Sequence, residues 1–203
     1  MPLSGNLPPK YAATPSFRRL MIFADGENLV LRYQSMIKNG WIPRDDMKHI
    51  RDILIWHESF SQMVSLDEVI RATYYTYVVG DDLRIQQVRE EIKGMLFNGH
   101  QNSHLPRNLT PKVFKKANRS VSGKGVDIEM TVDILNHVHR NNIDTVLMLS
   151  GDGDYLPLVR EVQRCGKSVY LSAFSDGLNS ELPIIADGFY CLDSTVFPHG
   201  KPQ

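Results

Sequence analysis

Short apolar runs alternate with amphipathic segments along the chain. Buried strands are predicted where consecutive large apolar residues are β-branched or aromatic, at 19–24, 71–79, 145–149, 167–173 and 188–192, with a further strand at 112–116. Helices are predicted where apolar positions recur every three to four residues, over 28–38, 45–57, 82–98, 125–140, 155–165 and 178–186. This alternation indicates an α/β fold, with a mostly parallel sheet covered by helices on both faces.

The same pattern predicts one domain between two tails. Residues 1–17 contain four prolines and few large apolar residues, which is typical of a flexible N-terminal tail. The periodic segments run without an interior linker or repeat from 18 to 195, and 196–203 are predicted to form a C-terminal tail. A chain of this size buries enough surface for a substantial core.

Composition narrows the function classes. The 203 residues include 23 Lys+Arg and 23 Asp+Glu, so the formal net charge is zero and a generally basic nucleic-acid coat is excluded. No apolar run approaches the ~20 residues of a membrane span, and the N-terminus lacks the apolar stretch of a secretory signal. Two cysteines, Cys165 and Cys191, cannot form a disulfide framework. A reduced, cytoplasmic protein with no membrane association is therefore expected.

Acidic turns follow two of the predicted strands. Asp25 and Asn28 lie in the turn after the first strand, and Ser150, Asp152 and Asp154 lie in the turn after the strand at 145–149. Ligands of open α/β sheets bind outside the carboxyl ends of the strands, so both turns are placed to share one crevice. Taken singly, each acid also fits an ordinary turn or a helix N-cap.

A third acidic group lies on the predicted helix at 125–140. Glu129 and Asp133 are one turn apart on the same helical face. Asp127 is about 120° away from Asp133 around an ideal helix, so these two share a site only if the first turn is irregular. Several carboxylates in one crevice repel one another unless protons or hard divalent cations such as Mg²⁺ or Mn²⁺ relieve the repulsion. Two such ions can activate water and stabilise the leaving oxygen in phosphoryl transfer.

Five motifs along the chain carry a family resemblance. The pattern hhhhDGxN is matched at 21–28, KGVDxxLxxD at 124–133, and SGDGDF at 150–155 with Tyr155 in place of Phe. PLVxxVxxxGKxV is matched at 157–169, and SxxLxxxADxFxxL at 180–192 with one spacing change. On these residues the chain resembles the NYN domain, of the LabA-type branch of the PIN-like nucleases, over about 19–193.

The resemblance implies a three-layer α/β/α PIN-like Rossmannoid fold and a divalent-metal-dependent ribonuclease that leaves 5′-phosphate and 3′-hydroxyl ends. It implies that Mg²⁺ or Mn²⁺ is bound by the catalytic acids Asp25, Asp127, Asp133 and Asp152, with Asp154 as a further ligand. Asn28, Ser150 and Lys124 would support them. Family membership alone defines the fold more firmly than the activity, since many LabA-type members resemble regulators.

A basic stretch leads into the third acidic group. No acidic residue occurs between Glu91 and Asp127, and we predict RNA contacts from Arg107, Lys112, Lys115, Lys116, Arg119 and Lys124. Phe114 in this stretch either stacks on an unpaired base or packs inward.

Two other readings remain open. The first is a catalytically weak or inactive NYN module that binds RNA or a protein partner in regulation, as a monomer or homo-oligomer. The second is a phosphatase that uses Asp152 as its nucleophile, because Asp152 and Asp154 resemble the DxDx[TV] motif of haloacid-dehalogenase-type enzymes. Leu156 stands where that motif has Thr or Val, which counts against the phosphatase.

Overall fold

A computed structural model describes residues 17–62, 67–98, 106–116 and 124–201. Its centre is a six-stranded sheet with the strand order β10-β9-β8-β1-β4-β7. The strands are β1 (Arg18–Asp25), β4 (Asp67–Val78), β7 (Thr110–Lys115), β8 (Thr145–Leu149), β9 (Ser168–Ala173) and β10 (Gly188–Cys191). Every neighbouring pair is parallel, so all the carboxyl ends meet at one edge. The predicted α/β class with a mostly parallel sheet is confirmed.

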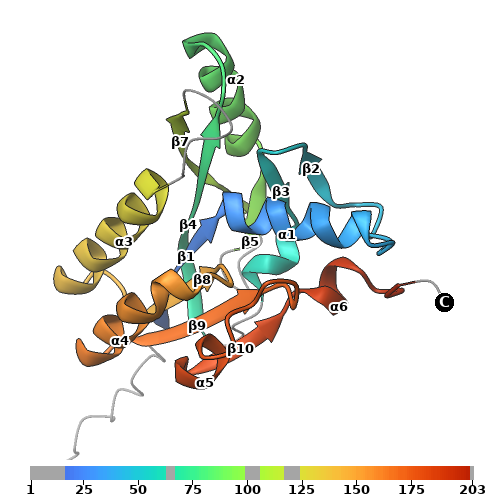
Figure 1. Cartoon of the computed structure of the whole chain (residues 1–203). Helices are drawn as coiled ribbons and strands as arrows, with labels where there is room; N and C mark the ends of the chain where they lie inside the picture. Colours follow the sequence, from blue (N-terminus) through green and yellow to red (C-terminus); the bar gives the residue numbers. More distant parts are fainter. Residues whose placement is uncertain (1–16, 63–66, 99–105, 117–123, 202–203) are drawn as a thin grey trace, which may run out of the picture.

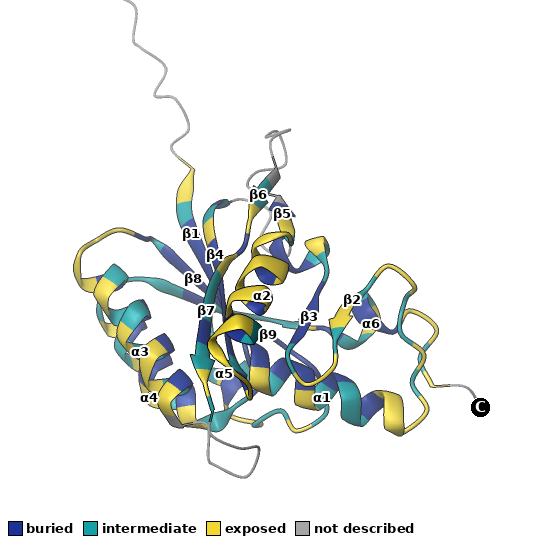
Figure 2. Ribbon diagram, turned by 90° about the horizontal axis from the view of Figure 1, so that it is seen from above, coloured by how far each residue is buried: buried dark blue, intermediate teal, exposed yellow. Residues whose placement is uncertain are grey.

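Helices cover both faces of this sheet (Figure 1). The packing against one face involves α1 (Gly26–Lys38), α2 (Asp82–Lys93) and α6 (Asp193–Val196). The other face is covered by α3 (Lys124–His139), α4 (Leu156–Arg164) and α5 (Leu182–Ile185). Along β1, Leu20, Ile22 and Ala24 contribute to the first core and Met21 and Phe23 to the second. Figure 2 shows that β1, β4 and β8 are largely buried. Because these central strands are covered on both faces, their sequences are continuous apolar runs.

The predicted helix at 45–57 is wrong. This segment contains an antiparallel hairpin of β2 (Lys48–Ile50) and β3 (Leu54–Trp56), followed by a short 3₁₀ helix η1 (Glu58–Ser61). Asp52 turns the chain with a positive φ of 61°, which a helix does not allow. The apolar spacing fitted a helix, but Trp56 is buried and its indole N–H donates to the carbonyl of Leu96 at 2.9 Å. Tertiary packing therefore overrides the local period.

A second prediction fails at the end of α2. The expected helix continued to a stop at Gly99, whereas α2 ends at Lys93 with Gly94 as its C-cap. The next residues form β5 (Leu96–Asn98), which pairs antiparallel with β6 (Pro106–Asn108). Both short strands fall in or beside the segment predicted as a polar loop, and β7 begins two residues before the predicted strand at 112–116.

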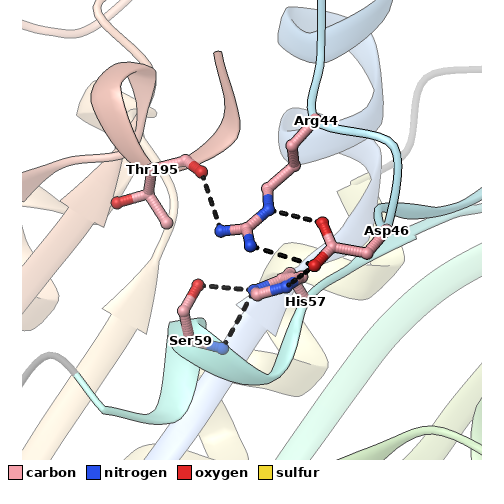
Figure 3. A network of polar contacts seen from close by, with 5 residues as sticks. All are labelled: Arg44, Asp46, His57, Ser59 and Thr195. Atoms are coloured by element: carbon pink, nitrogen blue, oxygen red, sulfur yellow. Dashed lines mark hydrogen bonds and ion pairs between the residues drawn. The ribbon is translucent and has the colours of Figure 1, made fainter. Parts of the chain in front are cut away.

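A polar network joins the β2–β3 region to the C-terminal segment (Figure 3). The Arg44 guanidinium donates two hydrogen bonds to the Asp46 carboxylate and a third to the carbonyl of Thr195. His57 Nε2 lies 3.2 Å from Asp46 Oδ2, and His57 Nδ1 accepts from the Ser59 backbone N–H at 3.1 Å. His57 thus caps η1 while its far nitrogen contacts Asp46, so the network fixes local structure.

The packed core extends past the predicted boundary at 195. Val196 is fully buried and Phe197 is 2% exposed. The Phe197 ring packs on Tyr33 and Trp41, with ring centroids 5.7 and 5.6 Å apart. The first residues of the predicted C-terminal tail are therefore core residues. The predicted N-terminal tail, apart from Phe17, lies outside the described residues. Among the described helices, none is both long and apolar enough to cross a membrane.

Candidate active site

Asp25 is the last residue of β1 and the N-cap of α1. Its Oδ1 accepts a hydrogen bond from the Asn28 backbone N–H at 3.1 Å, and its Oδ2 accepts from Ser150 Oγ at 2.9 Å. Only 2% of the residue is exposed. Gly26 makes this position possible, because a Cβ there would lie 2.6 Å from the carbonyl oxygen of Tyr75 on the neighbouring strand. The close approach seats the acid at the carboxyl edge of the sheet.

The turn after β8 lies directly against Asp25. The Gly151 backbone N–H donates to Asn28 Oδ1 at 3.1 Å, and the Asp152 N–H donates to Ser150 Oγ at 3.2 Å. The Asp152 carboxylate then caps a 3₁₀ turn, η2 (Gly153–Tyr155), by accepting from the Asp154 N–H at 3.0 Å. The two acidic turns, which are far apart in sequence, are therefore hydrogen-bonded to each other.

Tyr155 connects the first acid to the third acidic group. The residue is 2% exposed, and its hydroxyl donates toward Asp127 Oδ1 at 3.2 Å and toward Asp25 Oδ2 at 3.5 Å. Asp127 lies in the first turn of α3, and α3 packs against β1. Sequence analysis did not assign Tyr155 a role. The sequence feature that could have pointed to this role is the replacement of the Phe of the family pattern SGDGDF by Tyr155, which adds a hydroxyl group.

The electrostatics indicate crowded negative charge. The pKa of Asp25 is raised to about 7, mainly by burial. The hydrogen bonds from Asn28 and Ser150 lower this pKa, and the charges of Asp127 and Asp152 raise it. Burial likewise raises the pKa of Asp127, the Tyr155 hydrogen bond lowers it, and the charges of Asp152, Glu27 and Asp154 raise it. Asp25, Asp127 and Asp152 are thus close enough to repel one another.

Asp133 lies in different surroundings. Its Oδ2 accepts a hydrogen bond from the Tyr75 hydroxyl at 2.8 Å and forms an ion pair with Lys112 Nζ at 3.1 Å. Glu129 acts on the same tyrosine, since its charge contributes to the raised pKa of Tyr75. Asp127 belongs to the regular helix, so the irregular first turn that would bring it and Asp133 together is absent. The described contacts therefore group Asp25, Asp127 and Asp152, and place Asp133 with Lys112.

The donor chemistry of the three grouped acids suits a hard divalent cation. Mg²⁺ and Mn²⁺ prefer carboxylate oxygens, and such a cation would neutralise the repulsion between Asp25, Asp127 and Asp152. In this conformation, however, no three His, Cys, Asp or Glu side chains of the described residues are arranged as a ready set of metal ligands. The acids fit the cation by ligand type and by charge.

The predicted RNA-contacting residues do not form one patch. Arg107 lies at the amino end of β4, where it donates to the carbonyl of Val69 at 2.9 Å and pairs with Glu68 at 3.0 Å. Asp25, in contrast, lies beside Tyr75 near the other end of that strand. Arg107 therefore lies away from the acidic turns, and its RNA contact stays a prediction. Arg119 lies outside the described residues, as does the side chain of Lys124.

Lys112 and Lys115 lie on β7, Lys116 follows it, and each of these three lysines contacts an acid. Lys112 pairs with Asp133, and Lys115 pairs with Asp82 at 2.9 Å. Lys116 pairs with Glu27 at 2.9 Å and lies 4.9 Å above the centroid of the Tyr77 ring.

Phe114 packs inward. Its ring centroid is 6.2 Å from that of Tyr77, and it contributes to the core under α3. This favours the prediction that Phe114 packs inward over the prediction that it stacks on an unpaired base. Tyr77 in turn accepts a hydrogen bond from the Val126 N–H at 2.7 Å, which supports the N-terminus of α3 beside Asp127.

Fold and site together define an α/β domain whose acids gather at the carboxyl edge of a parallel sheet. The NYN domain family model matches residues 19–193, and the chain belongs to this family. NYN domains are part of the PIN-like superfamily and are generally nucleases, which typically use divalent metals.

Two known proteins are similar to this chain, one over a third of its length and the other over most of it. An uncharacterized protein from Methanocaldococcus jannaschii is 37% identical over 67 residues, which are 33% of this chain and 28% of the archaeal protein. The chain thus matches less than a third of the length of that relative. A crystal structure of a protein of unknown function from Vibrio parahaemolyticus has a TM-score of 0.63 and 18% identity. That match covers 90% of this chain and 98% of the Vibrio protein, and it shows the shared fold.

Proposed function

We propose that this chain is a divalent-metal-dependent ribonuclease in which Asp25, Asp127 and Asp152 hold Mg²⁺ or Mn²⁺. The observation that carries the proposal is the convergence of these three acids, with mutual repulsion, at the carboxyl edge of an NYN domain. Asp154 and Asp133 stay predicted ligands from the sequence. For Asp133 to join the site, its ion pair with Lys112 would have to open.

The chain's own residues hold the acids in place. Asn28 and Ser150 supply the hydrogen bonds that orient the Asp25 carboxylate, and the Asp154 N–H orients Asp152. The burial of Asp25 excludes water from one side of the site. A bound divalent cation supplies Lewis-acid activation of water and stabilisation of the leaving oxygen of a phosphodiester.

We further propose that a neighbouring RNA base binds in the groove between α1, the β2–β3 loop and the end of β4. This groove has a volume of about 260 Å³ and is lined by residues that include Glu27, Leu31, Val79 and Lys116. Leu31 and Val79 are 57% and 47% exposed, so both can contact the flat face of a base. Glu27, which lines the groove, lies two residues after Asp25 in the chain.

The groove has a direct test. Leu31→Asp should raise KM for a single-stranded RNA about fivefold or more and leave kcat unchanged, because contact with one base contributes about 1–3 kcal/mol. Leu83→Asp is the matched control, since Leu83 is 67% exposed on α2 and does not line the groove. Equal KM values for the two variants would refute the base site.

The cleavage experiment uses purified protein and an end-labelled RNA of mixed structure, with Mg²⁺, Mn²⁺ or EDTA. We expect metal-dependent cutting that Asp152→Asn abolishes, while RNA binding is largely retained. Asp45→Asn removes an exposed acid from the loop before β2 and should leave cutting unchanged. Metal-independent cutting, or cutting by Asp152→Asn at the normal rate, would contradict the proposed mechanism.

A second candidate is a regulatory NYN module that binds RNA or protein with little or no turnover. One observation favours it: Lys112, Lys115 and Lys116 each form an ion pair with an acid, which weakens their attraction for phosphate. Folded protein that cuts neither several RNAs nor single-stranded DNA would select this candidate.

A further inference from the structure

The Tyr155 hydroxyl lies where two carboxylates that a cation would join face each other. Its oxygen is 3.2 Å from Asp127 Oδ1 and 3.5 Å from Asp25 Oδ2, and the residue is 2% exposed. One O–H proton thus faces the buried Asp25 and the half-buried Asp127. A cation held by these two acids would repel the O–H proton that faces both of them, so the hydrogen bond and the cation compete.

The remaining contacts of these acids need not change on cation binding. Asp25 Oδ1 is held by the Asn28 N–H and Asp25 Oδ2 by Ser150 Oγ, and each carboxylate oxygen has a second lone pair. The Tyr155 hydroxyl differs from these donors, because it contacts both acids and its proton faces the two of them.

We propose that Tyr155 is a positioning residue that takes the place of the cation in the metal-free protein. Its hydroxyl bridges Asp127 and Asp25, holds the two acids in the metal-free arrangement and withdraws when a divalent cation binds. The proposal rests on the proposed function only in assuming that these acids bind a cation. It adds that this chain weakens its own metal affinity through a hydroxyl that the Phe of the family pattern lacks.

The test is Mn²⁺ affinity, measured by isothermal titration calorimetry and by the electron paramagnetic resonance signal of free Mn²⁺, on apo wild-type and Tyr155→Phe proteins. We expect Tyr155→Phe to bind Mn²⁺ about tenfold more tightly, because the cation no longer displaces a hydrogen bond to a charged group. In EDTA the variant should melt at a lower temperature than wild type, and saturating Mn²⁺ should remove that difference.

Tyr75→Phe is the matched control. Tyr75 is buried and donates an equivalent hydrogen bond to Asp133 on the same helix, but Asp133 is already paired with Lys112. This variant should lose the same thermal stability with and without Mn²⁺ and keep the wild-type affinity. An equal gain in affinity for both variants would overturn the proposal, because the effect would not belong to the Asp25–Asp127 pair.

Other outcomes are equally decisive. Unchanged or weaker Mn²⁺ binding by Tyr155→Phe overturns the proposal even if the wild type cleaves RNA, and so does the absence of Mn²⁺ binding by both proteins. Tighter binding by the variant without cleavage by either protein supports the proposal and refutes the ribonuclease function. If Tyr155→Phe does not fold, a structure of the wild type with Mn²⁺ decides: the Tyr155–Asp127 hydrogen bond should be broken.

Discussion

The buried carboxylate of Asp25 should make the metal-free protein less stable as the pH rises. The perturbation that isolates this effect is Asp25→Asn, which replaces a titrating carboxylate by a neutral amide of nearly the same shape. The amide oxygen can still accept from the Asn28 N–H, and the amide nitrogen can donate to Ser150 Oγ after that hydroxyl rotates. The two proteins then differ mainly in the charge at this position.

The magnitude follows from the shift in pKa. In the folded protein burial raises the pKa of Asp25 from 3.8 to about 7. Between these values the folded state retains a proton that the unfolded state has lost, so the free energy of unfolding falls as pH increases and levels off above about pH 7. Across this whole pH range the free energy of unfolding falls by about 4 kcal/mol. About 2 kcal/mol of that loss occurs above about pH 5.5.

The assay is urea unfolding in EDTA at about pH 5.5 and about pH 8. We expect the free energy of unfolding of Asp25→Asn, minus that of wild type, to grow by about 2 kcal/mol between the two pH values. Asp45→Asn, an exposed control, should show a difference that does not change with pH. A flat difference for Asp25→Asn as well would mean that Asp25 is charged throughout, and would refute the inference that its burial dominates.

Two further substitutions test the core around the site. Phe197→Ala should lower the free energy of unfolding by about 3–5 kcal/mol in urea titration, because the ring is 2% exposed and packs on Tyr33 and Trp41; a loss under about 1 kcal/mol would show that this segment is not core. Gly26→Ala should destabilise the protein by about 1–3 kcal/mol, since the new Cβ would lie 2.6 Å from a backbone oxygen; an unchanged thermal midpoint would refute the close approach.

Much of the sheet could be predicted because its strands are buried on both faces. Such strands are continuous apolar runs, and the helix ends beside them carry local signals such as the Asp81 side chain that caps α2. The hairpin at 48–56 could not be predicted this way. Its apolar residues fit a helical period as well as a strand, and the choice depends on Trp56 reaching the carbonyl of Leu96. Contacts of that kind leave no trace in local spacing.

The site residues likewise fall into those that the sequence could predict and those that it could not. The acidic turns could be predicted because each is a local motif at a strand end, and the parallel sheet brings strand ends together. The role of Tyr155 could not, because its hydroxyl acts on Asp25, 130 residues earlier in the chain. The separation of Asp133 from the other acids was partly foreseeable from helix geometry, but its pairing with Lys112 depends on the position of β7.

Charge pairing changes what the basic stretch can contribute to RNA binding. In sequence, Lys112, Lys115 and Lys116 stand apart from any acid, yet Lys116 pairs with Glu27, 89 residues away, and the other two also contact acids. An ion-paired lysine attracts a phosphate less than a free one does, because the partner carboxylate repels the phosphate at nearly the same distance. The acidic crevice, in contrast, repels RNA until a cation neutralises it. If the proposed function holds, divalent cations therefore contribute to RNA affinity as well as to cleavage, and affinity should fall in EDTA even for the inactive Asp152→Asn protein.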